Sequence, residues 1–190
     1  MTIETIIRQR RTVKPNSMNG KIIPDAVIEN LLELTNWAPT HGRTEPWRFV
    51  VYAPEKIQQF ADDHAALYKE NTSKEKFKEA SYEKLKQASE GASHVIIAYM
   101  KRGSNPNIPE IEEIAAASAA IQNLLLGAEA HGIVTFWSTS GMVHQDALKD
   151  YLGLQEEDRV LGFLYIGLTD EPAREGKRST PLSEKVKWVR

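Results

Sequence analysis

The sequence predicts an α+β sandwich in which helices cover a sheet. Helical and strand patterns alternate only loosely along the chain, and two helical patterns precede the first strand, which disfavours a doubly wound parallel sheet. No internal repeat divides the chain. Its 190 residues are 41% hydrophobic and 26% charged, which is enough apolar material for one substantial core. We therefore predict a single domain over residues 1–190.

The N-terminal part carries two helical patterns. Three isoleucines and Arg10 recur at helical spacing, so residues 2–10 should form a helix with Thr2 as its N-cap and Arg10 on the apolar face. A guanidinium group in that position needs a partner. A second helix should begin near Pro24, carry an apolar stripe and end before Pro39.

The middle of the chain predicts two strands separated by a helix and a charged segment. RFVVY (48–52) and HVIIAYM (94–100) have the composition of strands, and residues 54–68 predict a helix. The segment 69–90 interleaves lysine and glutamate with spaced aromatic residues. Two interpretations of it stay open: a solvated helix, or a mobile cover over a binding site.

The C-terminal half begins with the longest predicted helix. It spans residues 110–131, and the stretch IAAASAAIQNLLLGA (114–128) inside it is apolar almost all round. Gly132 should end the helix. Such a helix lies at the centre of a domain or in a dimer interface. The remaining patterns predict a strand, a short helix, a strand and an irregular basic tail at residues 133–138, 144–152, 159–167 and 170–190, respectively.

The net charge, the cysteine count and the length of the apolar runs argue against several classes of protein. A net charge of −2 argues against broad binding to nucleic-acid phosphates. With no cysteine, the chain has no disulfide framework or thiolate site, so redox chemistry would need a bound cofactor. No segment approaches the run of about 18 apolar residues that a membrane span requires, and MTIETIIRQRR lacks the apolar run of a signal peptide. We expect a cytoplasmic protein that binds neither nucleic acid nor membrane.

Common catalytic motifs are absent. The sequence contains no G-x-G-x-x-G after a strand, no Walker A motif, no H-E-x-x-H and no G-x-S-x-G. Asp62-Asp63-His64 is the nearest approach to a metal-binding cluster, but it lies in a polar helical pattern, and we predict no metal site. His64, His94 and His131 are most simply structural.

Three clusters of phosphate-type donors remain to be explained. RQRRTVK (8–14) lies where a helix meets a turn, WSTSG (137–141) ends a strand, and REGKRS (174–179) lies in the basic tail. Each cluster alone is more simply a solvated cap or loop. Together with the tryptophan- and histidine-bearing junction NWAPTHGRTEPWRFVVY (36–52), they suit an anionic ligand with a flat polar ring. Flavin mononucleotide (FMN) fits that description, because its phosphate needs arginine or lysine and its reduced ring is stabilised by a cation.

Four segments resemble the FMN-dependent nitroreductases. APTHGRTEPWRFVV (38–51) resembles the family pattern A-P-S-x-x-N-x-Q-P-W-x-F, and RQRRTVK resembles the opening R-x-S-x-K. FWSTSGMVHQDALKDYLGLQEEDRVLGFLYIG (136–167) resembles the later strand–helix–strand segment, and GKRSTPLSEKVKW (176–188) resembles the basic tail. The segments occur in the family order from end to end. The length and the histidine in APTHG resemble the small, compact branch of the family.

The resemblance implies a homodimer of α+β subunits, each with a central antiparallel sheet flanked by helices. The two chains would interlock and hold FMN at their interface. NADH or NADPH would reduce the flavin at N5 and leave, and a nitroaromatic, quinone or similar small aromatic acceptor would take its place. No side chain is implied as a catalytic acid or base. The implied cofactor-binding residues are Arg10, Arg11, Thr12, Lys14, Trp37, Thr40, His41, Trp137, Ser138, Thr139, Lys177 and Arg178.

The same resemblance implies a role for each of these residues. Lys14 would lie near the flavin N1 and the C2 carbonyl, whereas Thr40 and His41 would reach the cofactor from the other subunit. Trp37 would pack beside the cofactor or fill the dimer seam. The phosphate and ribityl end would be met by Arg10, Thr12 and the neighbouring Arg11, and by the tail residues Lys177 and Arg178. The ring edge would be lined by the backbone of Trp137, Ser138 and Thr139.

One departure from the family pattern leaves alternatives open. Arg43 and Glu45 stand where the family has amide side chains, and they would either form an ion pair or reshape the acceptor pocket. The chain could therefore be a non-catalytic FMN-binding or sensing module, or a family enzyme with a specialised substrate, such as a dehalogenase or a flavin-cleaving enzyme. Trp47 and Phe49, which follow in the same stretch, should belong to the core.

Overall fold

The computed structural model describes residues 1–190 and contains one four-stranded antiparallel sheet. The strand order is β1-β2-β4-β3. The strands are β1 (Trp47–Tyr52), β2 (His94–Met100), β3 (Val134–Ser138) and β4 (Arg159–Gly167). All three strand pairings are antiparallel. The prediction of an α+β fold with an antiparallel sheet is thereby confirmed.

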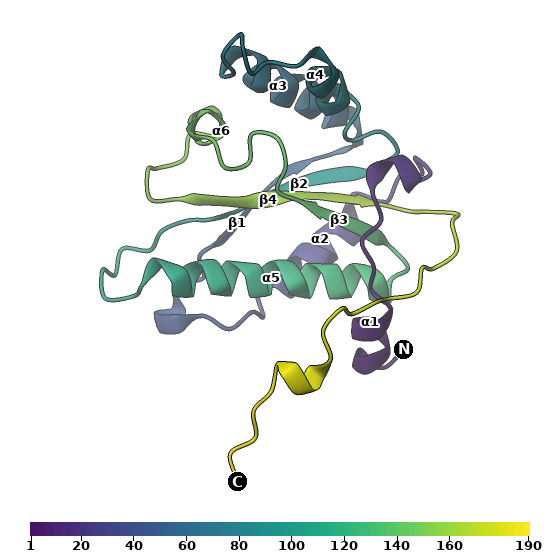
Figure 1. Cartoon of the computed structure of the whole chain (residues 1–190), viewed down its shortest axis with the longest axis vertical. Coiled ribbons are helices and arrows are strands. Elements are labelled where there is room, and N and C mark those ends of the chain that lie inside the picture. Colours follow the sequence, from purple (N-terminus) through teal and green to yellow (C-terminus); the bar gives the residue numbers. More distant parts are fainter.

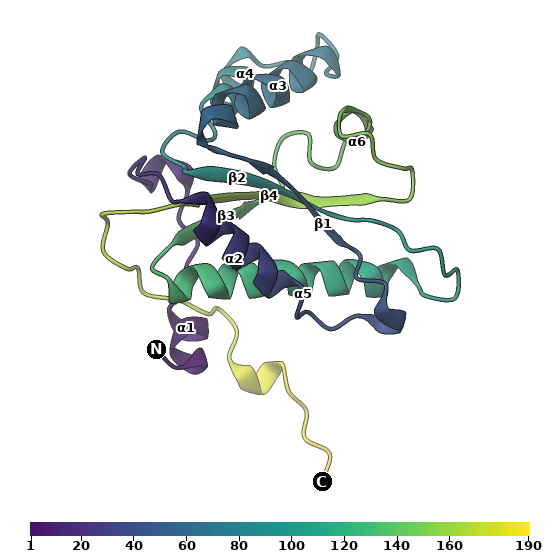
Figure 2. The same cartoon turned by 180° about the vertical axis from the view of Figure 1, so that it is seen from behind.

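Helices cover both faces of this sheet (Figures 1 and 2). Helix α5 runs along one face with α2 packed against it, and α1 lies beside one end of α5. Helices α3, α4 and α6 lie on the opposite face. The helices are α1 (Ile3–Gln9), α2 (Asp25–Thr35), α3 (Ile57–Glu70), α4 (Glu79–Lys86), α5 (Glu110–Ala130) and α6 (Asp146–Tyr151).

The predicted elements all form, with changes at their ends. The strands predicted at 94–100 and 159–167 have those bounds. The helix predicted at 54–68 begins instead with the 3₁₀ turn Pro54–Lys56, because proline can start a helical turn but donates no hydrogen bond within it. The charged segment 69–90 contains α4, which packs against α3.

The prediction that the isoleucines of α1 are buried is wrong for two of the three. Ile6 is 9% exposed, but Ile3 and Ile7 are 60% and 52% exposed in the single chain. Arg10 is the C-cap of α1, so it no longer belongs to the helical face. The periodicity correctly identified an apolar face, but within the chain only Ile6 of this face is covered, and Ile3 and Ile7 are left exposed.

The core is divided by the sheet into two layers. Leu124 of α5 and Leu164 of β4 are fully buried on the α2–α5 side. Phe163 of β4 is fully buried on the other side, against Phe60 of α3, at a centroid distance of 5.1 Å. Trp47 is buried next to the α5 alanines, which confirms its assignment to the core. β4 supplies buried residues to both layers, and with β2 it forms the inner pair of strands of the sheet.

An irregularity in the sheet positions the end of β3. The pairing of β2 with β4 shifts its register between Ala98 and Tyr99, opposite Gly162. Gly162 has φ +143°, and a Cβ atom there would lie 2.5 Å from Nε1 of Trp137. The indole therefore lies directly against the glycine, and its Nε1–H donates to the carbonyl oxygen of Leu161 at 2.9 Å. Any side chain at Gly162 would push Trp137 away from the sheet.

None of the helices combines the length and the hydropathy that crossing a bilayer would require.

A buried ion pair fixes the loop between β2 and α5. The guanidinium of Arg102 donates to the carboxylate of Glu113 and, through Nη2, to the carbonyl of Ile108 at 2.7 Å. The Glu113 carboxylate also accepts the backbone N–H of Gly103 at 3.1 Å. The Glu113 side chain is 1% exposed, so each of its bonds replaces water that the group has lost.

Replacing this carboxylate should destabilise the protein strongly. Glu113→Ala leaves the Arg102 guanidinium desolvated and unpaired, and should lower the free energy of unfolding by about 3–5 kcal/mol. Glu112→Ala, one residue away in a pair that is mostly exposed, should change it by no more than about 1 kcal/mol. Urea denaturation of both variants tests this expectation, and equal losses would contradict it.

Candidate functional site

A cavity of about 430 Å³ opens between the N-terminal segment, the end of β3 and the end of α4. It brings together Lys14 and Ser138, two of the predicted cofactor-binding residues. Phe136 and Tyr165 lie side by side on the adjacent strands β3 and β4, with ring centroids 5.8 Å apart and ring planes 24° apart. The remaining lining residues are Pro15, Asn16, Lys84, Gln87, Ala88, Glu90 and Ser140.

Lys14 reaches this cavity because the N-terminal segment runs beside β3. Thr12 and Thr135 form a parallel β-bridge, and the backbone N–H of Val13 donates to the carbonyl of Thr135 at 3.0 Å. A 3₁₀ turn at Pro15–Ser17 follows, closed by a bond from the Ser17 N–H to the Lys14 carbonyl at 2.9 Å. The lysine side chain is exposed, so its ammonium group can meet a ligand.

The WSTSG loop presents hydroxyl groups to the same cavity. Ser138 Oγ lies 2.8 Å from Ser140 Oγ and accepts the backbone N–H of Ser140 at 3.3 Å. Thr139 is exposed between them. Trp137 does not line the cavity, because its indole lies against Gly162 and is hydrogen bonded to β4.

The C-terminal end of this loop, at Met142, is hydrogen bonded to His64 of α3. The backbone N–H of Met142 donates to Nε2 of His64 at 3.0 Å. The imidazole is 3% exposed, and burial lowers the pKa of His64 from 6.5 to about 4. The expectation that Asp62-Asp63-His64 lies on a polar surface is therefore wrong for His64, which points into the core.

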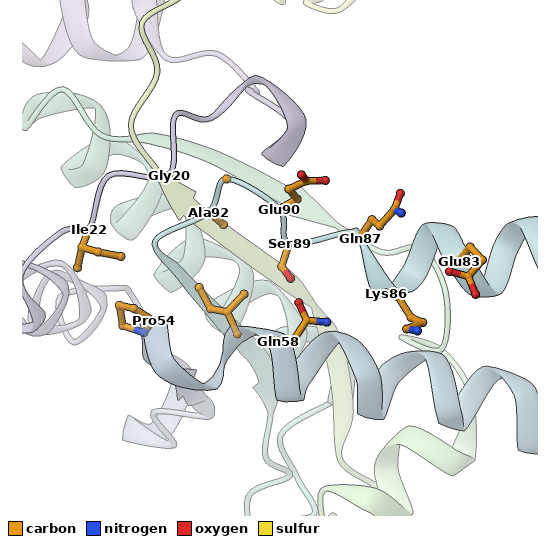
Figure 3. Close-up of a pocket in the computed structure, with 12 residues that line it drawn as sticks. Gly20, Ile22, Pro54, Gln58, Glu83, Lys86, Gln87, Ser89, Glu90 and Ala92 are labelled. Carbon is orange, nitrogen blue, oxygen red and sulfur yellow. The ribbon is translucent and has the colours of Figure 1, made fainter.

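A larger groove of about 640 Å³ lies on the other side of the end of α4 (Figure 3). Ser89 and Lys86 point into it towards Gln58, whereas Gln87 and Glu90 point away from Gln58. Gln87 and Glu90 also line the cavity beside Lys14. None of the predicted cofactor-binding residues lines this groove, and it lacks an aromatic wall. The smaller cavity is therefore the candidate site.

The first and the last basic clusters meet in space. Nε of Arg11 donates to the carbonyl of Arg174 at 3.0 Å, and Nη1 donates to the carbonyl of Arg8 at 2.7 Å. A Cβ atom on Gly176 would lie 2.2 Å from Nη2 of Arg11, so the tail crosses directly over the guanidinium. Arg11 thus holds the tail at Arg174 and Gly176. Lys177 is the residue that follows this crossing.

Trp37, Thr40 and His41 lie apart from this cavity. Nδ1 of His41 is 2.6 Å from a carboxylate oxygen of Glu112, in the first turn of α5. The segment carrying Lys14 lies near the opposite end of this helix (Figure 1). A 21-residue helix is about 30 Å long, so one chain cannot bring these residues to one ligand.

The departures from the family pattern do not form an ion pair. Arg43 and Glu45 both have positive φ angles, 57° and 43°, and no salt bridge joins them. Instead, the Glu45 carbonyl accepts a hydrogen bond from Nη1 of Arg48 at 2.7 Å. Thr40 Oγ1 accepts the backbone N–H of Glu45 at 3.2 Å, which closes the loop.

Several lining residues were not predicted from the sequence. Phe136 and Tyr165 were seen only as strand residues, and Gln87 and Glu90 only as part of a charged segment. Burial raises the pKa of Tyr165, so its phenol stays neutral at physiological pH. Gln87 is the C-cap of α4, and no motif in the sequence marked it as a site residue.

Comparisons with known proteins identify the family of the chain. A model of the nitroreductase family matches residues 7–168. The chain belongs to the nitroreductase family. The predicted resemblance, and with it the prediction of a nitroreductase-family enzyme, is therefore confirmed.

Individual nitroreductase-family proteins match almost the whole chain. YfhC of Bacillus subtilis, which carries the provisional name NAD(P)H nitroreductase, is 29% identical over 96% of this chain and 92% of its own. A nitroreductase-like protein of Bacillus cereus is 27% identical and superposes with a TM-score of 0.83, covering 100% of this chain and 96% of its own. A provisionally named nitroreductase of Desulfovibrio desulfuricans, solved with FMN, is 23% identical with a TM-score of 0.74, covering 100% and 98%.

The buried His64 should make the stability of this nitroreductase-family chain depend on pH. The unfolded chain binds a proton there near pH 6.5, whereas the folded chain, whose His64 pKa is about 4, does not. The contribution of His64 to the free energy of unfolding should therefore be fully present above pH 6.5. It should fall as the pH decreases towards 4, by up to about 1.4 kcal/mol per pH unit. Urea unfolding across this range should show a steeper loss for the native chain than for His64→Gln. Parallel curves would refute the assignment.

Proposed function

We propose that this chain is an NAD(P)H-dependent oxidoreductase that holds FMN in the cavity beside Lys14. The observation that carries the proposal is that the cavity combines a free ammonium group, hydroxyl groups and an aromatic wall. These groups fit FMN, whose ring is flat and apolar on its face and polar along its edge. When bound, FMN would supply hydride transfer from NADH or NADPH to a nitroaromatic, a quinone or a similar acceptor.

Lys14 would fix the polar edge of the ring. Its ammonium group would lie near the flavin N1 and the C2 carbonyl, where negative charge accumulates on reduction, and would favour the reduced form. Ser138 and Thr139 would contact the ring from the other edge through their backbone, with Trp137 supporting the loop from behind. No side chain is needed as a general acid, because the protein contributes position and electrostatics.

The phosphate would be held by the N-terminal and C-terminal basic clusters together. Arg10 and Thr12 flank Arg11, whose guanidinium already binds the tail at Arg174. This crossing would bring Lys177 and Arg178 of the tail to the phosphate from the opposite side. Cations from two distant segments would thus share one dianion, which suits the bidentate geometry of arginine.

The site would be completed by a second copy of the chain. Thr40 and His41 of the partner subunit would reach the cofactor, since those of the same chain lie beside the first turns of α5, at Glu112. The single chain exposes apolar residues that a homodimer would cover, among them Ile7 at 52% and Trp37 at 77%. The extended tail, with Trp188 75% exposed, would wrap around the partner and interlock the two chains. We further propose a single domain over residues 1–190 and a cytoplasmic location.

One observation favours a second candidate, a non-catalytic FMN-binding module. The end of α4 lines the cavity. An aromatic cluster joins α4 to α3, because the Phe77 ring lies 5.6 Å from that of Tyr68 in α3 and 6.2 Å from that of Tyr82 in α4. If this cover stayed closed, nicotinamide would never reach the flavin. Anaerobic addition of NADH or NADPH separates the candidates, because an enzyme's flavin bleaches promptly and a binding module's does not.

Lys14→Ala should raise the dissociation constant for FMN about ten- to hundredfold, because it removes one charge-assisted hydrogen bond to the cofactor. Lys56→Ala, an exposed lysine at the start of α3, is the matched control and should bind FMN as the native chain does. Fluorescence titration gives the affinity, and anaerobic stopped-flow bleaching gives the reduction rate. If both values are unchanged in Lys14→Ala, the proposed role of Lys14 is wrong.

Ile7→Glu should separate the dimer and lower its FMN content, because the glutamate would be buried in the proposed interface without a partner. Ile22→Glu is the control, since Ile22 is 60% exposed in the groove of Figure 3, away from α1. Gel filtration with light scattering gives the mass, and absorbance gives the flavin content. A native chain that elutes as one copy and still binds FMN would exclude the shared site.

A further inference from the structure

His64 is the point at which helix α3 meets the loop of the candidate site. Its Nε2 accepts the backbone N–H of Met142 at 3.0 Å. The loop that this bond closes begins at Ser138, and Ser138 and Ser140 both line the cavity. The imidazole itself does not line the cavity. Any effect of His64 on a ligand must therefore pass through the loop.

The imidazole is held rigidly on its other sides. It meets Phe163 edge-on with ring centroids 5.0 Å apart, and Phe60 lies 5.9 Å away at a tilt of 33°. Gly141 has φ +70°, and a Cβ atom there would lie 2.4 Å from Nε2 of His64. The loop backbone therefore closes directly onto the imidazole, with no space for a side chain between them.

The pattern of hydrogen bonds argues against a purely space-filling role. Nε2 can accept the Met142 N–H only when it carries no proton, so the neutral ring must carry its proton on Nδ1. Nδ1 is buried and has no hydrogen-bond partner. A buried donor without a partner costs stability, which leucine or methionine would avoid in the same space. What these apolar residues cannot supply is an acceptor for Met142.

We propose that His64 is a positioning residue, whose Nε2 holds residues 138–142 in the conformation that presents Ser138 and Ser140 to the flavin. The inference rests on the proposed function for its flavin part. Its structural part, the acceptor role of Nε2 and the fixed loop, concerns the free protein alone. Helix α3, against which α4 packs, is thereby connected by one hydrogen bond to the loop that lines the cavity.

Two variants at this position separate an acceptor from a space filler. In His64→Gln the carboxamide oxygen can accept the Met142 N–H, whereas His64→Met fills a similar volume without an acceptor of comparable strength. We expect FMN affinity within about threefold of the native value for glutamine, and a loss of at least about fivefold for methionine. Hydrogen exchange at the Met142 amide should quicken only in the methionine variant, because this amide is the donor that His64 accepts.

Circular dichroism and the melting temperature show whether both variants remain folded. If both are folded and lose affinity equally, or if the methionine variant keeps native affinity, the proposal is overturned. Nitrogen-15 NMR of the native chain without FMN provides a test that needs no variant. It should show a neutral imidazole with its proton on Nδ1 and a slowly exchanging Met142 amide, and a proton on Nε2 would overturn the proposal. If the native chain shows these signals but binds no FMN, the proposed function fails while the fixed loop remains.

Discussion

The pairing of the N-terminal segment with β3 is the interaction on which the candidate site depends. The bond from the Val13 N–H to the Thr135 carbonyl joins two segments that are far apart in the sequence, and it sets Lys14 beside the end of β3. A 3₁₀ turn follows at Pro15–Ser17, and the lysine side chain stays exposed. Without this bridge, the ammonium group and the serine hydroxyls would not share a cavity.

The rest of the site follows from how the sheet is covered. β4 supplies buried residues to both faces, and Gly162, at the register shift, leaves room for the Trp137 indole directly against its backbone. The loop after Trp137 is then closed from the other face by His64 of α3. Strand, loop and helix thus fix the hydroxyl side of the cavity, while α5 separates it from His41 by the length of a helix. This separation is why the proposed site needs two chains.

Sequence reasoning succeeded where local patterns decide the structure. The buried strands at 94–100 and 159–167 form with their predicted bounds, because a continuous apolar run between polar loops has few other solutions. It failed for Ile3 and Ile7, whose helical spacing identifies an apolar face but not what covers it. It placed Asp62-Asp63-His64 together on a polar surface, which is wrong for His64, although the interpretation of His64 as a structural histidine agrees with its burial.

The sequence by itself determined which residue types are available, namely the basic clusters and the serine-rich loop. The family can also be recognised from the sequence, because its motifs occur in order along the chain. Only the tertiary structure decided which of these groups meet. In the folded chain, Arg11 donates a hydrogen bond to the carbonyl of Arg174. Phe136 lies beside Tyr165, and Gln87 lines the cavity. The physical reason is that a motif fixes residue type and spacing, whereas such meetings depend on strand register and on long-range backbone hydrogen bonds, which leave no local pattern.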